Sequence, residues 1–336
     1  MSDFEFFDFL VVGDIATEFI IDLRNQSHPN VVGGPLLYAA GGLRCWTDRI
    51  AIVSHTSSKY KHFLERIHKI YKIDFRGVHF QDDACDDRQF LGYVSPNEVI
   101  IENPVAFYSS RKLTFPKELA GYVKNEPENQ LHGRSKYYPE DFPTHYRDVS
   151  AALICPSSLA TQIQLSTILL DTSTKNLVIQ SSPQYMNLTN FEIMPVLLKD
   201  LTAFVTTSDQ IRNLFRNRTT DLWEMADHLC SLGCEYVIVS DEVNGFNLYD
   251  RRAKLRLQSP AYPVESIDPT GMLASFCGGF LAGFKKNYDA FEALTLGIVS
   301  ASFTCEGSRP FYGADAIPGL YENRLKLVRE LVKKNE

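Results

Sequence analysis

The stretch SIDPTGMLASFCGGFLAGF, residues 266–284, joins a turn to a helix of small, apolar residues. The composition of DPTG, residues 268–271, predicts the turn, and residues 274–284 are apolar enough for a buried helix. The free N–H groups at such a helix start, together with the helix dipole, favour an anion. A purely structural turn into a core helix gives the same pattern, so both interpretations stay open here. The chain has no P-loop motif and no dinucleotide-binding fingerprint.

A second glycine-rich stretch, GGPLLYAAGGLRCW, covers residues 33–46. Paired glycines precede a helical pattern, and a second pair, Gly41 and Gly42, lies inside it. The first pair allows the backbone to approach a ligand, and the inner pair favours close contact with a neighbouring element. Packing is the simpler explanation when this stretch is considered alone.

Short apolar runs alternate with longer helical patterns through most of the chain. Each run has a nearly continuous hydrophobic centre, which is typical of a strand buried on both faces. These runs are FLVVGD (9–14), AALICP (151–156), NLVIQS (176–181), TAFVTT (202–207) and EYVIVS (235–240). Residues 220–233 have helical spacing, with Asp221 near the start and Gly233 after the end. Repeated βα units predict an α/β fold with a mostly parallel sheet covered by helices.

Three segments depart from this alternation. Residues 86–110 contain strand-like pieces and a turn at residues 95–97, which predicts a small antiparallel flap. Residues 121–148 are rich in Pro, Tyr, His and charge and predict a long surface excursion, while residues 323–334 predict an amphipathic helix. No segment has the composition of a linker, so we expect a single domain over residues 1–336.

The composition excludes several classes of protein. The chain of 336 residues has a formal net charge of −7, which argues against nucleic acid and anionic lipid as partners. No apolar run is long enough to predict a membrane span, and the first residues lack the features of a signal peptide. Seven scattered cysteines predict reduced core thiols. We therefore expect a cytoplasmic protein.

Taken in order, four motifs give the chain a resemblance to a known family. VVGDIATEFIID (11–22), GGPLLYAAGG (33–42), DRQFLGY (87–93) and DPTGMLASFCGGFLAGF (268–284) resemble the ribokinase or PfkB family of carbohydrate kinases. The resemblance spans about residues 8–320. It implies a ribokinase-like three-layer sandwich, with a central, mostly parallel sheet flanked by helices and a small β lid from residues 15–32 and 86–110. It also implies ATP and Mg²⁺ as cofactors and transfer of the γ-phosphate to a substrate hydroxyl.

The chain departs from this family at its catalytic signature. The family sequence D-T-x-G-A-G-D forms an anion hole and ends on the Asp that accepts the hydroxyl proton. Here the corresponding anion-hole and base positions are Gly271, Met272, Leu273 and Ala274. Loss of a general base costs about 10² to 10⁴ in rate, and each misplaced anion-hole donor about 10² to 10³. The resemblance therefore implies near-zero phosphotransfer, unless Asp268 at the same helix mouth substitutes as the base.

Other positions carried over from the family have also changed. The positions that match its nucleotide and magnesium site are Thr207, Gln210, Glu242, Gly245, Thr270 and Gly271. The positions that match its substrate site are Glu18, Gly33, Gly34 and Tyr38. Gln210 replaces a Glu that organises the magnesium water shell, so ATP and Mg²⁺ binding is in doubt. Tyr38 replaces an Asn, so the hydrogen-bonding pattern of the substrate pocket must differ.

Three hypotheses follow from these departures. The first is a pseudokinase that binds a small molecule, such as a sugar, nucleoside or nucleotide, or a protein partner. The second is an active ATP-dependent sugar or nucleoside kinase with a relocated base. The third is an assembly role, in which alternating apolar residues along 88–108 pair the lid strands of a homodimer.

Overall fold

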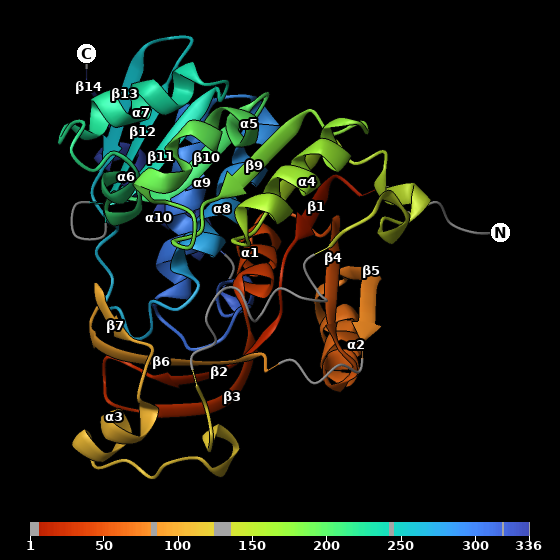
Figure 1. Cartoon of the computed structure of the whole chain (residues 1–336), viewed down its shortest axis with the longest axis vertical. Coiled ribbons are helices and arrows are strands. Elements are labelled where there is room, and N and C mark those ends of the chain that lie inside the picture. Colours follow the sequence, from red (N-terminus) through yellow and green to blue (C-terminus); the bar gives the residue numbers. More distant parts are fainter. Residues whose placement is uncertain (1–6, 82–85, 124–135, 242–244, 318, 336) are drawn as a thin grey trace.

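The large central sheet separates two layers of helices, and a second, smaller sheet lies at one end of it (Figure 1). This computed structural model describes residues 7–81, 86–123, 136–241, 245–317 and 319–335. Within these residues the large sheet has the order β14-β13-β12-β11-β10-β9-β8-β1-β4-β5. Its strands are β1 (Phe9–Val12), β4 (Ile50–Ser57), β5 (Asp74–Gln81), β8 (Ala151–Ile154), β9 (Asn176–Gln180), β10 (Ala203–Thr207), β11 (Tyr236–Asp241), β12 (Gly245–Asp250), β13 (Leu255–Ser259) and β14 (Lys333–Asn335).

In this sheet the seven neighbouring strands β5, β4, β1, β8, β9, β10 and β11 run parallel. At the other edge β12, β13 and β14 add antiparallel strands. All five strands predicted from apolar runs are confirmed as parallel members of this sheet. Their hydrophobic centres are buried because helices cover both faces.

The side-chain alternation of β1 shows how the two layers arise. Phe9 and Val11 point to one core, and Leu10 and Val12 point to the other. The first core is covered by α1 (Pro35–Arg44), α2 (Lys61–Tyr71), α8 (Met272–Asn287), α9 (Ala290–Thr304) and α10 (Leu320–Leu331). The second is covered by α4 (Leu159–Leu170), α5 (Met194–Leu198), α6 (Ser208–Leu214) and α7 (Leu222–Ser231). The three-layer α/β architecture expected from the sequence is confirmed.

The smaller sheet contains strands from two separate parts of the chain. Its order is β3-β2-β6-β7, and we call it the lid sheet. The strands are β2 (Ala16–Ile21), β3 (Ser27–Gly33), β6 (Arg88–Ser95) and β7 (Glu98–Ile100). One face packs on α3 (Pro104–Ser110) around Phe19, Phe90 and Tyr108. The lid sheet therefore has a hydrophobic core of its own.

Three predictions at the segment level were wrong in part. Residues 104–110 form α3 instead of a strand, because Asn103 caps a helix that begins at Pro104. The C-terminal helix ends at Leu331, and residues 333–335 pair with β13 as β14. The 121–148 excursion lies partly outside the described residues, but its later part is not confined to the surface. Tyr137, Phe142 and Tyr146 are buried in the second core.

Glycines bring α1 and α8 into close contact. A Cβ on Gly42 would lie 2.1 Å from the carbonyl oxygen of Ser275, and one on Gly278 would lie 2.2 Å from that of Ala39. The packing explanation for these glycines is therefore correct. The contact fixes the start of α8 relative to the residues of α1.

Two expectations about the whole chain can be compared with the described residues. None of their helices combines the length and apolarity needed to cross a bilayer. The six described cysteines are free thiols, of which four are buried, and Cys85 lies outside the described residues.

Candidate ligand-binding site

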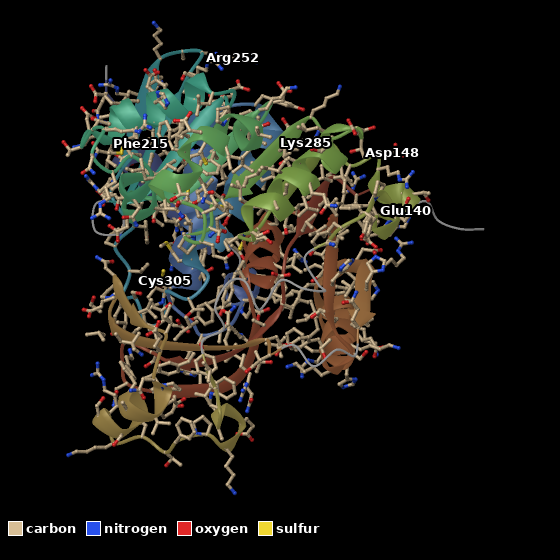
Figure 2. All side chains as sticks on the ribbon, in the orientation of Figure 1. Glu140, Asp148, Phe215, Arg252, Lys285 and Cys305 are labelled. Atoms are coloured by element: carbon tan, nitrogen blue, oxygen red, sulfur yellow. The ribbon has the colours of Figure 1, made fainter. Side chains whose placement is uncertain are left out.

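A cavity of about 630 Å³ lies between the large sheet, the start of α8 and the lid sheet. Its wall includes Gln180, Thr207 and Ser240 at the carboxyl ends of β9, β10 and β11. The lid sheet contributes Leu91 and Tyr93. Cys305 also borders the cavity and, in the view of Figure 2, lies between the lid sheet and the helices of the main layers.

The mouth of α8 forms one side of this cavity. Gly271 precedes the helix with a left-handed φ of 73° and provides no side-chain cap. The first intrahelical bond runs from the Ser275 N–H to the Gly271 carbonyl at 2.9 Å. The N–H groups of Leu273 and Ala274 therefore precede the hydrogen-bonded ladder, and both residues line the cavity. The turn and buried helix predicted from residues 266–284 are confirmed.

The predicted base position offers no carboxylate to the cavity. Ala274 is 3% exposed and contributes only a methyl group to the wall. Asp268, the proposed substitute, is fully buried and is not among the described residues that line the cavity. Its Oδ1 accepts the Thr270 N–H at 2.9 Å. This bond stabilises the turn, so the geometry favours a structural role for Asp268.

Burial also changes the acidity of Asp268. It raises the pKa of this carboxyl above its usual range, although contacts with Thr270 and Ser308 oppose the shift. Oδ2 has no hydrogen bond of normal geometry among the described residues. Asp268 is therefore a confined acid beneath the helix mouth.

Glu18 lines the cavity but is held by groups of the protein itself. Its Oε1 accepts the Gly34 N–H at 2.8 Å, and its Oε2 accepts the Tyr38 hydroxyl at 3.0 Å. Gly33 leaves room for the carboxylate, since a Cβ there would lie 2.1 Å from Oε2. Burial raises the pKa of Glu18 from 4.5 to about 8, although both hydrogen bonds lower it. The four predicted substrate-site residues therefore lie together, with Gly33, Gly34 and Tyr38 around the buried carboxylate of Glu18.

The ring of Tyr38 connects this acid to the helix mouth. A Cβ on Gly271 would lie 2.0 Å from the ring, so the aromatic face packs directly on the glycine. Burial, with the nearby Glu18, raises the pKa of the Tyr38 hydroxyl well above its usual value. The side chain therefore stays neutral and separates Glu18 from the start of α8.

A lid residue closes over the same turn. The Tyr93 hydroxyl on β6 lies 3.0 Å from the Thr270 hydroxyl. Burial raises the pKa of Tyr93 above its usual range, so this contact joins two neutral hydroxyls. The lid sheet and the helix mouth are thus linked across the cavity.

The predicted nucleotide positions fall into two groups. Thr207, Thr270 and Gly271 line the cavity. Gln210 does not line it, because its Oε1 accepts the Ser181 hydroxyl at 2.5 Å. Gly245 has a φ of 94°, and a Cβ there would lie 2.1 Å from the Ser259 carbonyl oxygen, so it allows close backbone contact between the start of β12 and the end of β13. Glu242 lies outside the described residues.

Two polar wall residues were not identified from the sequence. Gln180 is 9% exposed, and its Oε1 has no hydrogen-bond partner among the described residues. Ser240 is 2% exposed and lies at the equivalent end of β11. Both follow an apolar run, and a polar residue at the carboxyl end of a buried parallel strand is a signal for a ligand site. The signal was present in NLVIQS and EYVIVS.

The charge of the wall is low. Among the described lining residues the carboxylates are those of Glu18 and Glu98, and none is Lys or Arg. Glu98 is an exposed residue of the lid strand β7. The remaining wall combines aromatic and aliphatic side chains with neutral hydroxyl and amide groups.

The comparisons with known proteins agree with this architecture. No family model matches the chain. A cytidine kinase of Thermococcus kodakarensis is 32% identical over 81 residues, which are 24% of this chain and 29% of that kinase. The chain thus matches less than a third of the length of this curated relative.

Solved structures match over nearly the whole chain. A candidate ribokinase II from E. coli in complex with ATP and Mg²⁺ has a TM-score of 0.69 at 14% identity, covering 96% of this chain and 99% of that one. Aminoimidazole riboside kinase from Salmonella enterica, complexed with aminoimidazole riboside and an ATP analogue, has a TM-score of 0.68 at 13% identity, covering 94% and 99%. The chain therefore has the ribokinase-like fold of the ribokinase and PfkB kinases.

Proposed function

We propose that this chain is a pseudokinase of the ribokinase and PfkB family that binds a small, neutral molecule in the cavity beneath the lid sheet. The observation that carries the proposal is that, among the described residues, the start of α8 presents no carboxylate to the cavity, where Ala274 contributes a methyl group. Without a carboxylate there, a substrate hydroxyl has no positioned base to accept its proton. Phosphotransfer is lost or very weak.

Three acids near the cavity, Glu18, Asp268 and Asp209, are poorly suited to replace that base. The oxygens of Glu18 accept hydrogen bonds from Gly34 and Tyr38. Asp268 is fully buried beneath the turn, and Asp209 is exposed to solvent. These placements favour a pseudokinase over an active kinase with a relocated base.

The wall supports a nucleoside or a sugar as the ligand. Its aromatic residues offer stacking surfaces, and Gln180 presents a buried amide oxygen without a partner. Among the described lining residues no cation is available to balance a triphosphate. Similar proteins include a cytidine kinase and an aminoimidazole riboside kinase, so we prefer a nucleoside as the class of ligand.

The same proposal includes weak binding of ATP and Mg²⁺ by this chain. Family members hold these cofactors, and one structurally similar protein was solved with both. Here Gln210 is neutral and bonded to Ser181, so it adds no charge to a magnesium water shell. We expect a neutral nucleoside to bind more tightly than MgATP.

A protein partner, a homodimer through the lid sheet and a cytoplasmic location stay predictions. Val94 on β6, Val99 on β7 and Val105 on α3 are exposed by 45%, 40% and 59%. Light scattering of the full chain and of a Val94→Glu, Val99→Glu variant tests the homodimer. A monomer at all concentrations contradicts it.

Calorimetry with cytidine, ribose, fructose, ADP and MgATP tests the binding part of the proposal. We expect one neutral ligand to bind with 1:1 stoichiometry and Gln180→Ala to weaken it about tenfold, the effect of losing a buried hydrogen bond. The matched control is Gln184→Ala, since Gln184 is exposed and outside the cavity wall. Equal affinities for both variants, or no binding by any compound, would contradict the proposal.

A further inference from the structure

Three potential metal ligands meet at the far edge of the large sheet, outside the cavity wall. His55 lies on β4, His79 lies on the edge strand β5, and Asp141 ends the short 3₁₀ helix Pro139–Asp141. His55 and His79 are register partners on neighbouring parallel strands, so their side chains share one face. Glu140, the neighbour of Asp141, lies above β4 and β5 at the edge of the molecule in Figure 2.

The distances are close to those of a metal site. The Nε2 of His55 lies 3.2 Å from Oδ2 of Asp141, and the Nε2 of His79 lies 4.0 Å from Oδ1. One ligand atom from each residue lies within 4.8 Å of the other two. Tetrahedral Zn²⁺ with bonds of about 2.0–2.1 Å separates its ligand atoms by about 3.4 Å. The Nε2 of His55 and Oδ2 of Asp141 are close to this spacing, and the Nε2 of His79, at 4.0 Å from the other carboxylate oxygen, must move closer.

The surroundings orient two of the three ligands. His55 is 6% exposed, and its ring stacks on Tyr137 with centroids 4.7 Å apart. Oδ2 of Asp141 accepts the Tyr138 N–H at 2.8 Å, a bond that fixes the carboxylate as outer contacts do in known sites. His79 is 38% exposed and gives an ion a path from solvent. In its present position its Nε2 contacts the Asp141 carbonyl oxygen at 2.8 Å.

We propose that His55, His79 and Asp141 bind a divalent transition-metal ion, with Zn²⁺ as the reference ion and water in the fourth position. Two imidazoles and one carboxylate form a ligand set that suits Zn²⁺ and similar ions. The ion joins β4, the edge strand β5 and the segment that contributes Tyr137 to the second core. Its role is to stabilise this edge of the fold, and it takes no part in the proposed ligand binding.

Histidine and aspartate side chains also form ion pairs without a metal, so the test must distinguish a metal site from an ion pair. The full chain, treated with a chelator and dialysed, is titrated with Zn²⁺ in a calorimeter, and thermal unfolding is measured with and without the ion. We expect 1:1 binding and an increase in Tm on addition of Zn²⁺. His79→Ala and Asp141→Asn should each weaken binding at least about tenfold and remove the increase in Tm.

The two variants and one control show whether Zn²⁺ binds at the proposed residues. Asp141→Asn retains an oxygen for the Tyr138 N–H, so it preserves the local turn while removing the charge. His62→Ala is the control, because the His62 side chain is 95% exposed on α2. Zn²⁺ binding that is absent, or that is unchanged in both folded variants, would overturn the proposal. Binding lost in His62→Ala instead would place the ion elsewhere and would overturn it too.

Discussion

The hydroxyl groups of Tyr93 and Thr270 lie 3.0 Å apart and join the lid sheet to the turn that precedes α8. The two residues are far apart in the chain, so this contact holds the lid sheet over the cavity. The helix mouth beside this contact includes Ala274. The contact therefore lies at the place where we propose that the catalytic base is missing.

Removing the lid contact should loosen the lid with little effect elsewhere. We expect Tyr93→Phe to lower the free energy of unfolding by about 1 kcal/mol, the usual net worth of one hydrogen bond. Hydrogen exchange in β6 and β7 should become faster. A double-mutant cycle with Thr270→Val checks the pairing, because the double variant should lose less than the sum of the two single variants. Strict additivity would contradict the contact.

The buried acid Glu18 should make the protein less stable as the pH rises. Its pKa is raised from 4.5 to about 8 in the folded chain. The folded state therefore binds a proton that the unfolded state has released, and stability falls as the pH rises from 4.5 to about 8. The loss levels off above the folded pKa and is on the order of a few kcal/mol.

The variant Glu18→Gln isolates this effect. A neutral amide matches the protonated acid, so the variant should equal the wild type below about pH 4 and exceed its stability near pH 8. Denaturant unfolding across this range measures the difference. Glu98→Gln, at the exposed lid residue, is the matched control and should keep the wild-type slope. A parallel pH dependence for Glu18→Gln and the wild type would contradict the shifted pKa.

The contact between α1 and α8 should tolerate no added side chain. In Gly42→Ala the new Cβ meets the Ser275 carbonyl oxygen, so α1 must move away from α8. We expect a loss of about 1–3 kcal/mol, together with weaker ligand binding because Tyr38 moves with α1. In Gly319→Ala the Cβ meets nothing within 4 Å, so only the left-handed φ is penalised and ligand binding should stay unchanged. Wild-type stability of Gly42→Ala in thermal or denaturant unfolding would contradict the close contact.

The sequence predicted the fold well because local patterns determine it. Continuous apolar runs located β1 and β8 to β11, and residues 268–284 located the turn and the helix. The C-terminal helix was extended too far because pairing of residues 333–335 with β13 depends on a distant strand. Burial of Tyr137 likewise depends on contacts that no local pattern contains.

The site was predicted less completely. Family motifs brought together Glu18, Tyr38 and Gly271, but the two hydrogen bonds that hold Glu18 come from the folded geometry. Gln180 was overlooked although its place at a strand end is a recognised signal. The cluster of His55, His79 and Asp141 has no fixed spacing in the sequence, because strand register and a distant turn bring it together.

Under the proposed function, introducing the family signature should produce measurable phosphotransfer. The variant Met272→Ala, Leu273→Gly, Ala274→Asp, Gln210→Glu places an acid at the mouth of α8 and keeps an acceptor for Ser181. We expect its phosphotransfer to exceed that of the same variant with Ala274 unchanged by at least about 10², the contribution of a general base. Equal rates in the two folded variants would mean that the substrate or nucleotide site has also been lost.

Release of ADP from MgATP by the wild-type chain tests the central claim most directly. The panel contains cytidine, aminoimidazole riboside, ribose and fructose, and the restored variant is assayed in parallel. The account predicts no ADP beyond that formed without a second substrate. Substrate-dependent turnover within the ordinary enzyme range of about 1–10³ s⁻¹ would contradict it and show that another group accepts the hydroxyl proton.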